Sequence, residues 1–219
     1  MTMTPSDQRP ITVVPATPEC WLDIEELFAR LACWCQYWRV SAGEYGRVST
    51  GELYGGRLAE RRDALRQQLE RAMPPGMLAY IDDQIVGWCG FGRRHELERL
   101  ARSRTIPAVD DRPVWAIVCF LVRVGYRRRG VARALLQGAI DYAREHGAPA
   151  LEAYPVDPDS QRVDVTGAYV GTVSMFEQAG FRRVIETAAR SAGLPRWLMR
   201  LEFAAPSGDR RSNAGGTDS

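Results

Sequence analysis

The chain lacks lysine altogether, although 29 of its 219 residues are basic, so every one of those 29 is an arginine. Arginine is a rigid, bidentate partner for phosphate and carboxylate groups. A biased genome composition would give the same usage, so the absence assigns no function by itself. No GK[ST] sequence occurs, which excludes the phosphate loop of the Walker A type.

Histidine and cysteine are also scarce, and their pattern argues against a metal centre. There are two histidines and five cysteines, and the pair Cys33 and Cys35 has no second CxC or CxxC pair to complete four ligands. An odd number of cysteines in mostly apolar contexts favours reduced, buried thiols over a disulfide framework. We therefore predict no metal and a cytoplasmic protein.

Long apolar runs are missing as well. No stretch of 18 or more apolar residues occurs, and no basic region followed by an apolar one begins the chain, so neither a membrane span nor a signal peptide is expected. The formal net charge is only +2, which argues against general binding of polyanions such as nucleic acids. With 45% apolar and 26% charged residues, the composition is that of an ordinary soluble protein.

The remaining patterns predict one α/β domain, since roughly 100–200 residues are usual per domain. We expect a flexible N-terminus over 1–8, a single domain over 9–203 and a disordered tail over 204–219. Periodicity predicts helices at 19–31, 56–73, from 131 to Gly147, and 166–180, with a turn or short helix at 93–103. It predicts strands at 11–17, 76–81, 84–92, 114–124, 150–156, 181–189 and 196–203. This order indicates a mixed sheet with helices on both faces.

The segment RVGYRRRGVARALL (123–136) carries the clearest functional signal. It joins the apolar run at 114–124, which is typical of a buried central strand, to an apolar-striped helix. A helix N-terminus offers free N–H groups and partial positive charge, and Gly130 and Ala132 leave room for a phosphate to approach the backbone. Arginines beside them add charge-assisted hydrogen bonds. The turn therefore favours a pyrophosphate site over a merely solvated charge run.

The same segment resembles the acetyl-CoA-binding motif [RQ]xxGx[GA] of the GNAT (Gcn5-related N-acetyltransferase) superfamily. Arg127-Arg128-Arg129-Gly130-Val131-Ala132 reads as this motif, and MFEQAGF (175–181) resembles the family's later helix that ends in GF. The likeness covers about residues 77–203. It implies a mixed, mostly antiparallel sheet of about six to seven strands flanked by helices. It also implies that acetyl-CoA binds as co-substrate along the backbone of Phe120, Leu121 and Val122, and at Arg127, Arg128, Arg129, Gly130, Val131, Ala132 and Arg133.

The resemblance further implies direct acetyl transfer to an amine, with one departure from the family pattern. Many members carry a tyrosine four residues before the glycine of GF, where it acts as the acid. Here that position is Phe176, and Tyr169 stands where an asparagine is often found. Tyr154 and Tyr169 are the candidate substitutes for the acid, unless the thiolate leaves unassisted.

For the base, Glu152 is the first candidate, because a carboxylate in an apolar strand needs a reason. Glu152 and Tyr154 would point to the same face of a strand and so place an acid and a base on one wall of the cleft. Alternatively, Glu152 pairs with an arginine such as Arg123 or faces solvent. His95 with Glu96, or a base acting through water, are further alternatives, and Cys119 is interpreted as a core residue.

The acceptor is expected against the first two helices and the final strands. Trp34, Tyr37 and Trp38 could hold an amine through cation–π contacts, and Arg39 or Arg93 could hold a carboxylate. Core packing is the alternative for at least two of the aromatic residues. No acidic cluster marks a site for polycations, which favours a small-molecule amine, although aminoglycosides, polyamines and protein lysines stay open. A homodimer is possible.

Two other functions compete with the enzyme. Because position 176 lacks the tyrosine, a non-catalytic acyl-CoA sensor of the same fold is the alternative. A nucleic-acid-binding protein that uses Arg127–Arg129 is the third, which the near-neutral net charge disfavours.

Overall fold

The structure of the chain, a computed structural model, describes residues 9–45, 56–158 and 168–203. Its centre is one seven-stranded sheet in the order β1-β2-β3-β4-β5-β7-β6. The strands are β1 (Thr12–Pro15), β2 (Gly76–Ile81), β3 (Gln84–Arg93), β4 (Trp115–Val122), β5 (Ala150–Ala153), β6 (Arg182–Ser191) and β7 (Leu194–Glu202). Only β4 and β5 run parallel, so the prediction of a mixed, mostly antiparallel sheet is confirmed.

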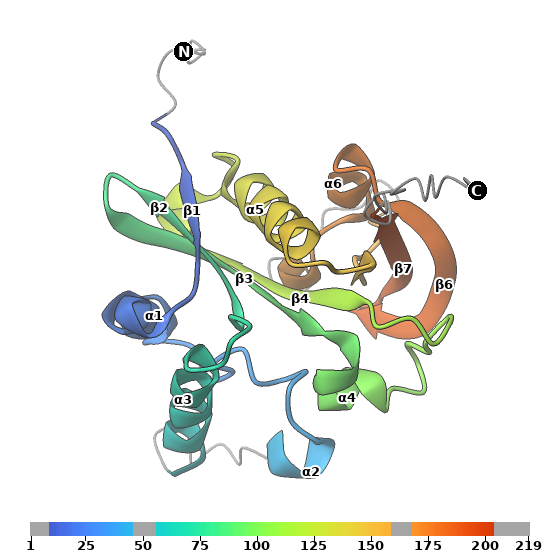
Figure 1. Cartoon of the computed structure of the whole chain (residues 1–219), viewed down its shortest axis with the longest axis horizontal. Helices are drawn as coiled ribbons and strands as arrows, with labels where there is room; N and C mark the ends of the chain where they lie inside the picture. The colour runs from blue at the N-terminus through green and yellow to red at the C-terminus, as the bar shows by residue number, and fades with distance from the viewer. Residues whose placement is uncertain (1–8, 46–55, 159–167, 204–219) are drawn as a thin grey trace, which may run out of the picture.

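Helices cover both faces of this sheet (Figure 1). They are α1 (Trp21–Phe28), α2 (Ala42–Tyr45), α3 (Gly56–Leu69), α4 (Glu98–Ala101), α5 (Val131–Glu145) and α6 (Val173–Gln178). Side chains of α5 and α6 share one core cluster with the sheet, and side chains of α1 and α3 share another on the opposite face. A third cluster lies beneath α4.

Helix α5 lies unusually close to the strands because glycines remove the side chains between them. A Cβ at Gly87 in β3 would come within 2.8 Å of Val131 Cγ1. A Cβ at Gly138 in α5 would come within 2.5 Å of Val13 Cγ1 in β1. This close packing fixes where α5 begins, and therefore where the arginine-rich turn before it lies.

The final third of the chain differs from the expected elements in one place. The helix expected at 166–180 is broken into a 3-10 turn, η5 (Ala168–Val170), and α6. Gly171 separates them with a φ of +77°, a left-handed conformation that ends a helix. The expected final hairpin is present as β6 and β7, which pair antiparallel around Ala192 and Gly193.

The expected flexible N-terminus and disordered tail lie outside the described residues, as do residues 46–55 and 159–167. Within the described part of the chain, no helix combines the length and the apolar character needed to cross a membrane.

Candidate active site

The sheet opens between β4 and β5. The two strands pair only from Trp115 to Ile117 on β4, whereas β4 continues to Val122. Strand β3 pairs with β4 along its other edge as far as Val122, so within the described residues Phe120–Val122 have one edge without a strand partner. Free backbone groups along this edge could hydrogen-bond an extended ligand.

A β-bulge in β4 marks the point where the strands part. Gly90 pairs with Cys119 and Phe91 with Ile117, which leaves Val118 as the extra residue. As a result Val118 and Cys119 both face the side of α1 and α4, while Ile117 and Phe120 face α5. A bulge bends a strand and re-aims its side chains, so the residues that follow it turn away from β5.

The turn predicted to hold phosphates follows this free edge at once. Arg128 has a φ of +61° and Gly130 a φ of +85°, and Gly130 caps the N-terminus of the 15-residue helix α5. Left-handed residues in such a turn can point successive N–H groups toward one spot, the arrangement of known anion-binding turns. Among the described residues, a Cβ at Gly130 would meet only Ile11 within 4 Å, at 3.9 Å, so space remains over its backbone.

The arginines around this turn are free to bind an anion. Arg127, Arg128, Arg129 and Arg133 are all exposed, and none forms an ion pair with another described residue. The guanidinium of Arg129 lies 5.3 Å from the ring centroid of Tyr126, and Nε of Arg127 is 3.4 Å from the carbonyl oxygen of Val122. Val131, by contrast, is buried in the core, and Ala132 is half-buried beside it, so only their backbone can serve a ligand.

Behind the bulge, Cys35 and Cys119 lie together, a contact that the sequence did not predict. Sγ of Cys35 accepts a hydrogen bond from the indole of Trp88 at 3.2 Å, and it also contacts the thiol of Cys119 and the guanidinium of Arg39. Trp34 and Cys35 hold positive φ angles of 45° and 55°, which is strained backbone for such residues. The loop before α2 thus packs Cys35 against the sheet.

This surrounding of donors favours a thiolate at Cys35. Its hydrogen bond with Cys119, together with the charge of Arg39 and the indole of Trp88, lowers the pKa of Cys35 to about 6 against the opposing effect of burial. The pKa of Cys119 is raised for the same reason, because it keeps the shared proton, and burial adds to the effect. Cys119 is half-buried and packs against two of the core clusters, so its packing agrees with the core role expected from the sequence.

The two positions that depart from the family pattern differ in burial: the side chain of Phe176 is fully buried and that of Tyr169 is only half-buried. Phe176 is fully buried, with its ring 6.1 Å from that of Phe120 and 5.0 Å from that of Phe181. Tyr169 in η5 is half-buried and lies within electrostatic range of Cys119 and Cys33. Burial raises the pKa of Tyr169, so its hydroxyl keeps its proton at neutral pH.

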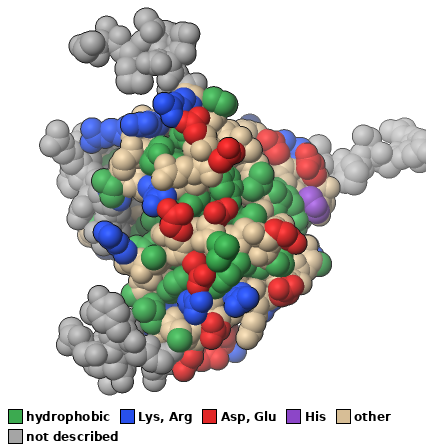
Figure 2. All heavy atoms as spheres, turned by 90° about the vertical axis from the view of Figure 1, so that its left-hand side faces the viewer, with side chains coloured by type: hydrophobic (Ala, Val, Ile, Leu, Met, Phe, Trp, Pro, Cys, Tyr) green, Lys and Arg blue, Asp and Glu red, His purple; other side chains and the backbone are tan. Residues whose placement is uncertain are grey.

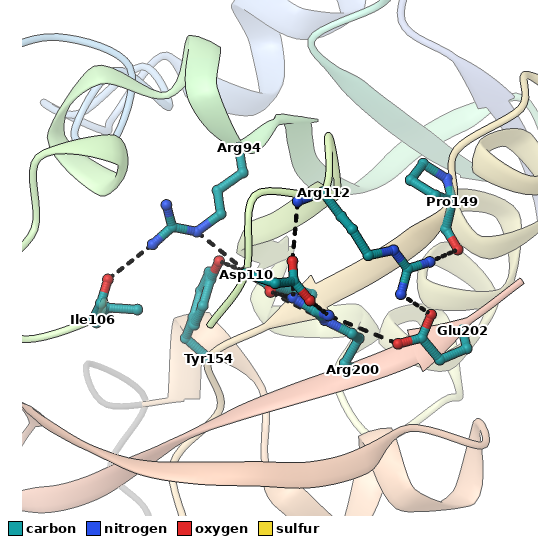
Figure 3. A network of polar contacts seen from close by, with 9 residues as sticks. Arg94, Ile106, Asp110, Arg112, Pro149, Tyr154, Arg200 and Glu202 are labelled. Carbon is teal, nitrogen blue, oxygen red and sulfur yellow. Dashed lines mark hydrogen bonds and ion pairs between the residues drawn. The ribbon is translucent and has the colours of Figure 1, made fainter. Parts of the chain in front are cut away.

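Glu152 and Tyr154 contact each other but face the protein interior. The hydroxyl of Tyr154 donates to Oε2 of Glu152 at 2.7 Å, as expected for neighbours on one face of a strand. Arg200 donates to Oε1 at 2.6 Å, and Arg94 lies 3.3 Å from Oε2 (Figure 3). Asp110 in turn binds Arg200, and Arg94 donates to the carbonyl of Ile106 at 2.9 Å.

This network corrects the expectation of an open cleft wall. Glu152 is 0% exposed and Tyr154 is 1% exposed, because the segment around α4 covers this end of β5. The partners are Arg94 and Arg200 rather than Arg123, which instead pairs with Glu26 at 2.8 Å. Both carboxylate oxygens of Glu152 are occupied, which is the geometry of a buried ion pair. The alternative pair His95 and Glu96 is on the surface, at 3.8 Å from one another.

The aromatic residues expected to line an acceptor site divide into core and surface. Trp34 is buried between Trp21 and Phe28, with ring centroids 6.1 and 5.6 Å away. Trp38 is buried in the cluster beneath α4, whereas Tyr37 remains 38% exposed. Two of the three are therefore packing residues, as the sequence allowed.

Arg39 and Arg93 lie away from the turn at Gly130. Nη2 of Arg39 donates to the carbonyls of Pro75 and Phe91, and Nη1 of Arg93 lies 3.1 Å from Glu96. Both line a pocket of about 340 Å³ together with Tyr142 and His146 at the C-terminal end of α5. Gly130 begins this helix, and at 1.5 Å per residue its 15 residues separate the two ends by roughly 20 Å. The two arginines thus do not adjoin the phosphate turn.

Comparison with known families decides the class of protein. The profile of the family described as Acetyltransferase (GNAT) matches residues 44–181, which include the free edge of β4, the arginine turn and α6. The chain belongs to the GNAT acetyltransferase family. No curated protein sequence matches the chain.

Solved GNAT structures share the fold over nearly all of their length. One of these structures is described as histone acetyltransferase HPA2 and related acetyltransferase, from Corynebacterium glutamicum ATCC 13032. It is 20% identical, with a TM-score of 0.52, and the match covers 90% of this chain and 98% of that one. A ribosomal-protein-alanine N-acetyltransferase from Brucella melitensis is 17% identical, with a TM-score of 0.51, covering 88% and 99%. An N-acetyltransferase from Staphylococcus aureus Mu50 is 13% identical, with a TM-score of 0.52, covering 88% and 98%. At such identities the likeness shows the fold alone.

Two features of this GNAT domain escaped sequence analysis although the sequence holds a signal for each. Arg196 and Arg200 share one face of β7 with Leu198, and Trp197 and Met199 make the other face apolar, so a strand buried on both sides must enclose its arginines. Cys35 gave only a weak signal, since a CxC pair indicates metal binding before it indicates an isolated thiolate. In the described residues no group of three metal-ligating side chains comes together.

Proposed function

We propose that this chain is an acetyl-CoA-dependent N-acetyltransferase that acts on a small-molecule amine. One observation carries the proposal: the unpaired edge of Phe120–Val122 leads directly to the left-handed Gly130 at the N-terminus of α5. An extended pantetheine arm would bind the edge, and the pyrophosphate would bind the turn. Four exposed arginines, none of them paired with an acidic side chain of the described residues, supply the charge that two phosphates require.

The bulge at Val118 lies where we expect the thioester of acetyl-CoA and the acceptor amine to meet. A thioester bound along the edge would reach the fork between β4 and β5, where backbone N–H groups can stabilise the negative charge that develops on its carbonyl oxygen. The amine attacks the carbonyl carbon, the C–S bond breaks and CoA leaves as a thiolate. The protein contributes mainly by holding the two reactants together.

For the departing thiolate we propose Tyr169 as the acid. Its hydroxyl is half-buried, keeps its proton at neutral pH and lies within range of Cys119 at the bulge. Phe176 has no proton to give. We do not propose Glu152 as the base, because its oxygens already accept hydrogen bonds from Arg200 and Tyr154. The amine would then lose its proton to solvent in the cleft.

A panel of amines tests this function. Release of the CoA thiol would be followed with acetyl-CoA and primary amines of several classes: amino acids, polyamines, aminoglycosides and a lysine-containing peptide. Amine-dependent thiol release that scales with enzyme concentration supports the enzyme. Acetyl-CoA binding without turnover on any amine would favour the alternative, a non-catalytic acyl-CoA sensor, which the loss of the usual tyrosine at Phe176 keeps in contention.

A role in nucleic-acid binding has less support. On the face shown in Figure 2, acidic and basic side chains are mixed and form no continuous basic surface. The basic side chains of the turn are confined to one end of α5, which suits a compact anion better than a polymer.

A further inference from the structure

Arg196, near the start of β7, is a buried cation in an unusual position. Its residue is 3% exposed, and Nε donates to the carbonyl oxygen of Tyr154 at 2.8 Å. Its guanidinium carbon lies 5.3 Å from the ring centroid of Trp38. The side chain therefore reaches under the loop that carries Tyr37 and Trp38, at the point where the chain leaves β5.

Within the described residues, no carboxylate neutralises this guanidinium. Among the described residues, Arg196 forms no ion pair, and the charged neighbours expected of a buried arginine are replaced by Tyr169, Tyr154 and Tyr37. Burial raises the pKa of Tyr154 and of Tyr169, so these phenols are neutral and supply no counter-charge. Burial in turn lowers the pKa of Arg196.

Arg200 lies four residues further along β7, on the same face of the strand. It is a buried arginine whose charge is neutralised by acidic side chains. It is 8% exposed, but it binds both Glu152 and Asp110 (Figure 3). Burial works against its charge, yet these two partners together raise the pKa of Arg200. The contrast shows that the fold supplies acidic partners to one arginine on this face of β7, whereas the described residues supply none to Arg196.

Unused donors gather around Arg196. Nη2 of Arg196 and Nε1 of Trp38 are both buried without a hydrogen-bond partner. Nε of Arg99 is in the same state, and its guanidinium lies 4.2 Å from the ring of Tyr37. A buried donor without an acceptor costs about 1–3 kcal/mol, and more if it is charged. Nη2 of Arg196 and Nε1 of Trp38 belong to side chains in contact, so one negatively charged acceptor could serve both donors.

The surroundings of Arg196 connect it to the fork in the sheet. Tyr169, the proposed acid, lies within electrostatic range of Arg196, of Tyr37 and of Cys119. Tyr37 is 38% exposed, so the group reaches solvent on the side of this tyrosine. An acceptor held at the fork would therefore extend from the thioester toward Arg196.

We propose that Arg196 binds a carboxylate of the acceptor, so that the substrate is a small amine that also carries a carboxylate, as an amino acid does. Nη2 of Arg196 and Nε1 of Trp38 donate to the carboxylate, and the amine is thereby aimed at the bulge. This inference rests on the proposed acetyltransferase function and narrows its acceptor class. Arg39 and Arg93, predicted from the sequence for the same task, are engaged elsewhere.

Matched substrates test the proposal directly. Each L-amino acid would be compared with its own α-amide, which keeps the amine and removes the negative charge. We expect kcat/KM to favour the acid by about tenfold or more, the discrimination that a charge-assisted hydrogen-bonded pair provides. In Arg196→Gln this preference should vanish, mainly through KM, and Arg196→Lys should restore part of it. Arg190→Gln on the exposed side of β6 is the control and should keep the preference.

Stability separates a binding role from a packing role. Because Arg196 has no counter-ion among the described residues, Arg196→Met should unfold at the same or a higher temperature, whereas Arg200→Met should unfold at a clearly lower one. Acetyl-CoA affinity should be unchanged in Arg196→Met. Equal rates on acids and amides in the wild type, or a preference that survives Arg196→Gln, would overturn the proposal.

If no amino acid or amide is turned over, product-like probes decide. N-acetyl amino acids and their amides would be added with CoA, and the shift in unfolding temperature measured. A shift for the acids alone that disappears in Arg196→Met supports the carboxylate site even if turnover is absent. No difference between acids and amides overturns it. Failure of acetyl-CoA itself to bind the wild type would instead refute the proposed function.

Discussion

The thiol of Cys35 lies directly against the backbone of Gly90: a Cβ at residue 90 would come within 2.5 Å of Sγ. The same Cβ would lie 3.0 Å from Nε1 of Trp88 and 3.6 Å from Cβ of Cys119. Gly90 pairs with Cys119 beside the bulge, so the glycine makes room for the thiolate at the fork of the sheet. The absence of one side chain in β3 therefore shapes the candidate site.

Gly90→Ala should destabilise the protein, because the added methyl group must displace Cys35. We expect a loss of about 1–3 kcal/mol in the free energy of unfolding, the usual cost of overpacking. Gly125→Ala is the control, since a Cβ there has no neighbour within 4 Å. Chemical denaturation measures both. Combining Gly90→Ala with Cys35→Ala should recover part of the loss, and additive losses in the double variant would show that the two residues do not compete for space.

The thiolate of Cys35 should make stability depend on pH. Its pKa in the folded protein is about 6, below the ordinary thiol value near 9. The stabilisation is therefore complete above pH 9, declines as the pH falls toward 6, and is absent below 6. The pKa values of Cys119, Cys89 and Cys33 are raised in the folded protein. These three thiols therefore reduce the stability of the protein only above pH 9, outside this window.

Denaturation curves of the wild type and Cys35→Ser under reducing conditions measure this effect. The difference in the free energy of unfolding between the two proteins should grow in favour of the wild type from pH 6 to pH 9. A difference that stays constant over this range would show that Cys35 remains a neutral thiol.

Glu152→Gln should damage folding rather than chemistry. The substitution leaves Arg94 and Arg200 facing an amide in a buried site, and breaking a buried ion pair costs roughly 3–5 kcal/mol. We expect turnover per folded molecule to change little. Denaturation and active-site titration together give both quantities. Loss of turnover with full stability would restore Glu152 as the base.

Tyr169→Phe should slow the chemical step while leaving acetyl-CoA affinity intact. Removal of a general acid costs about 10²–10⁴-fold in rate, and a neutral phenylalanine keeps the packing of η5. Tyr142→Phe, at the far end of α5, is the matched control. Pre-steady-state acetyl transfer measures the step. Equal rates in Tyr169→Phe and the wild type would mean that the CoA thiolate leaves unassisted.

The sequence predicted well those features that depend on local physics. Three such features are the helix break after α3, the hairpin of β2 and β3, and the start of α5 at Gly130. Each is determined by turn residues and periodicity among residues that are close together in the sequence. The left-handed φ of Gly130 is the kind of conformation that only glycine adopts readily, so its role could be read from its neighbours.

Features that depend on contacts between distant segments were not predictable in this way. Glu152 receives partners from residues 58 positions before it and 48 after it, and no local pattern reveals that these arginines close over it. Trp34 was expected at the acceptor, but the strained turn at Cys35 directs it into the core. Arg196 and Arg200 lie on the same strand, but the pairing of β7 with β5 places Glu152 opposite Arg200 and not opposite Arg196. This register cannot be read from the sequence of β7 alone.

Calorimetric titration with acetyl-CoA tests the central claim, that Gly130 and its arginines form the site for the co-substrate. The wild type should bind acetyl-CoA saturably, and free CoA as well, with ATP much weaker. Gly130→Glu should abolish binding, because its carboxylate would occupy the place of a phosphate. Gly147→Glu introduces the same charge at a left-handed glycine at the other end of α5, with φ +75° and open space, and should bind normally. Equal binding by Gly130→Glu, shown to be folded, would contradict the account.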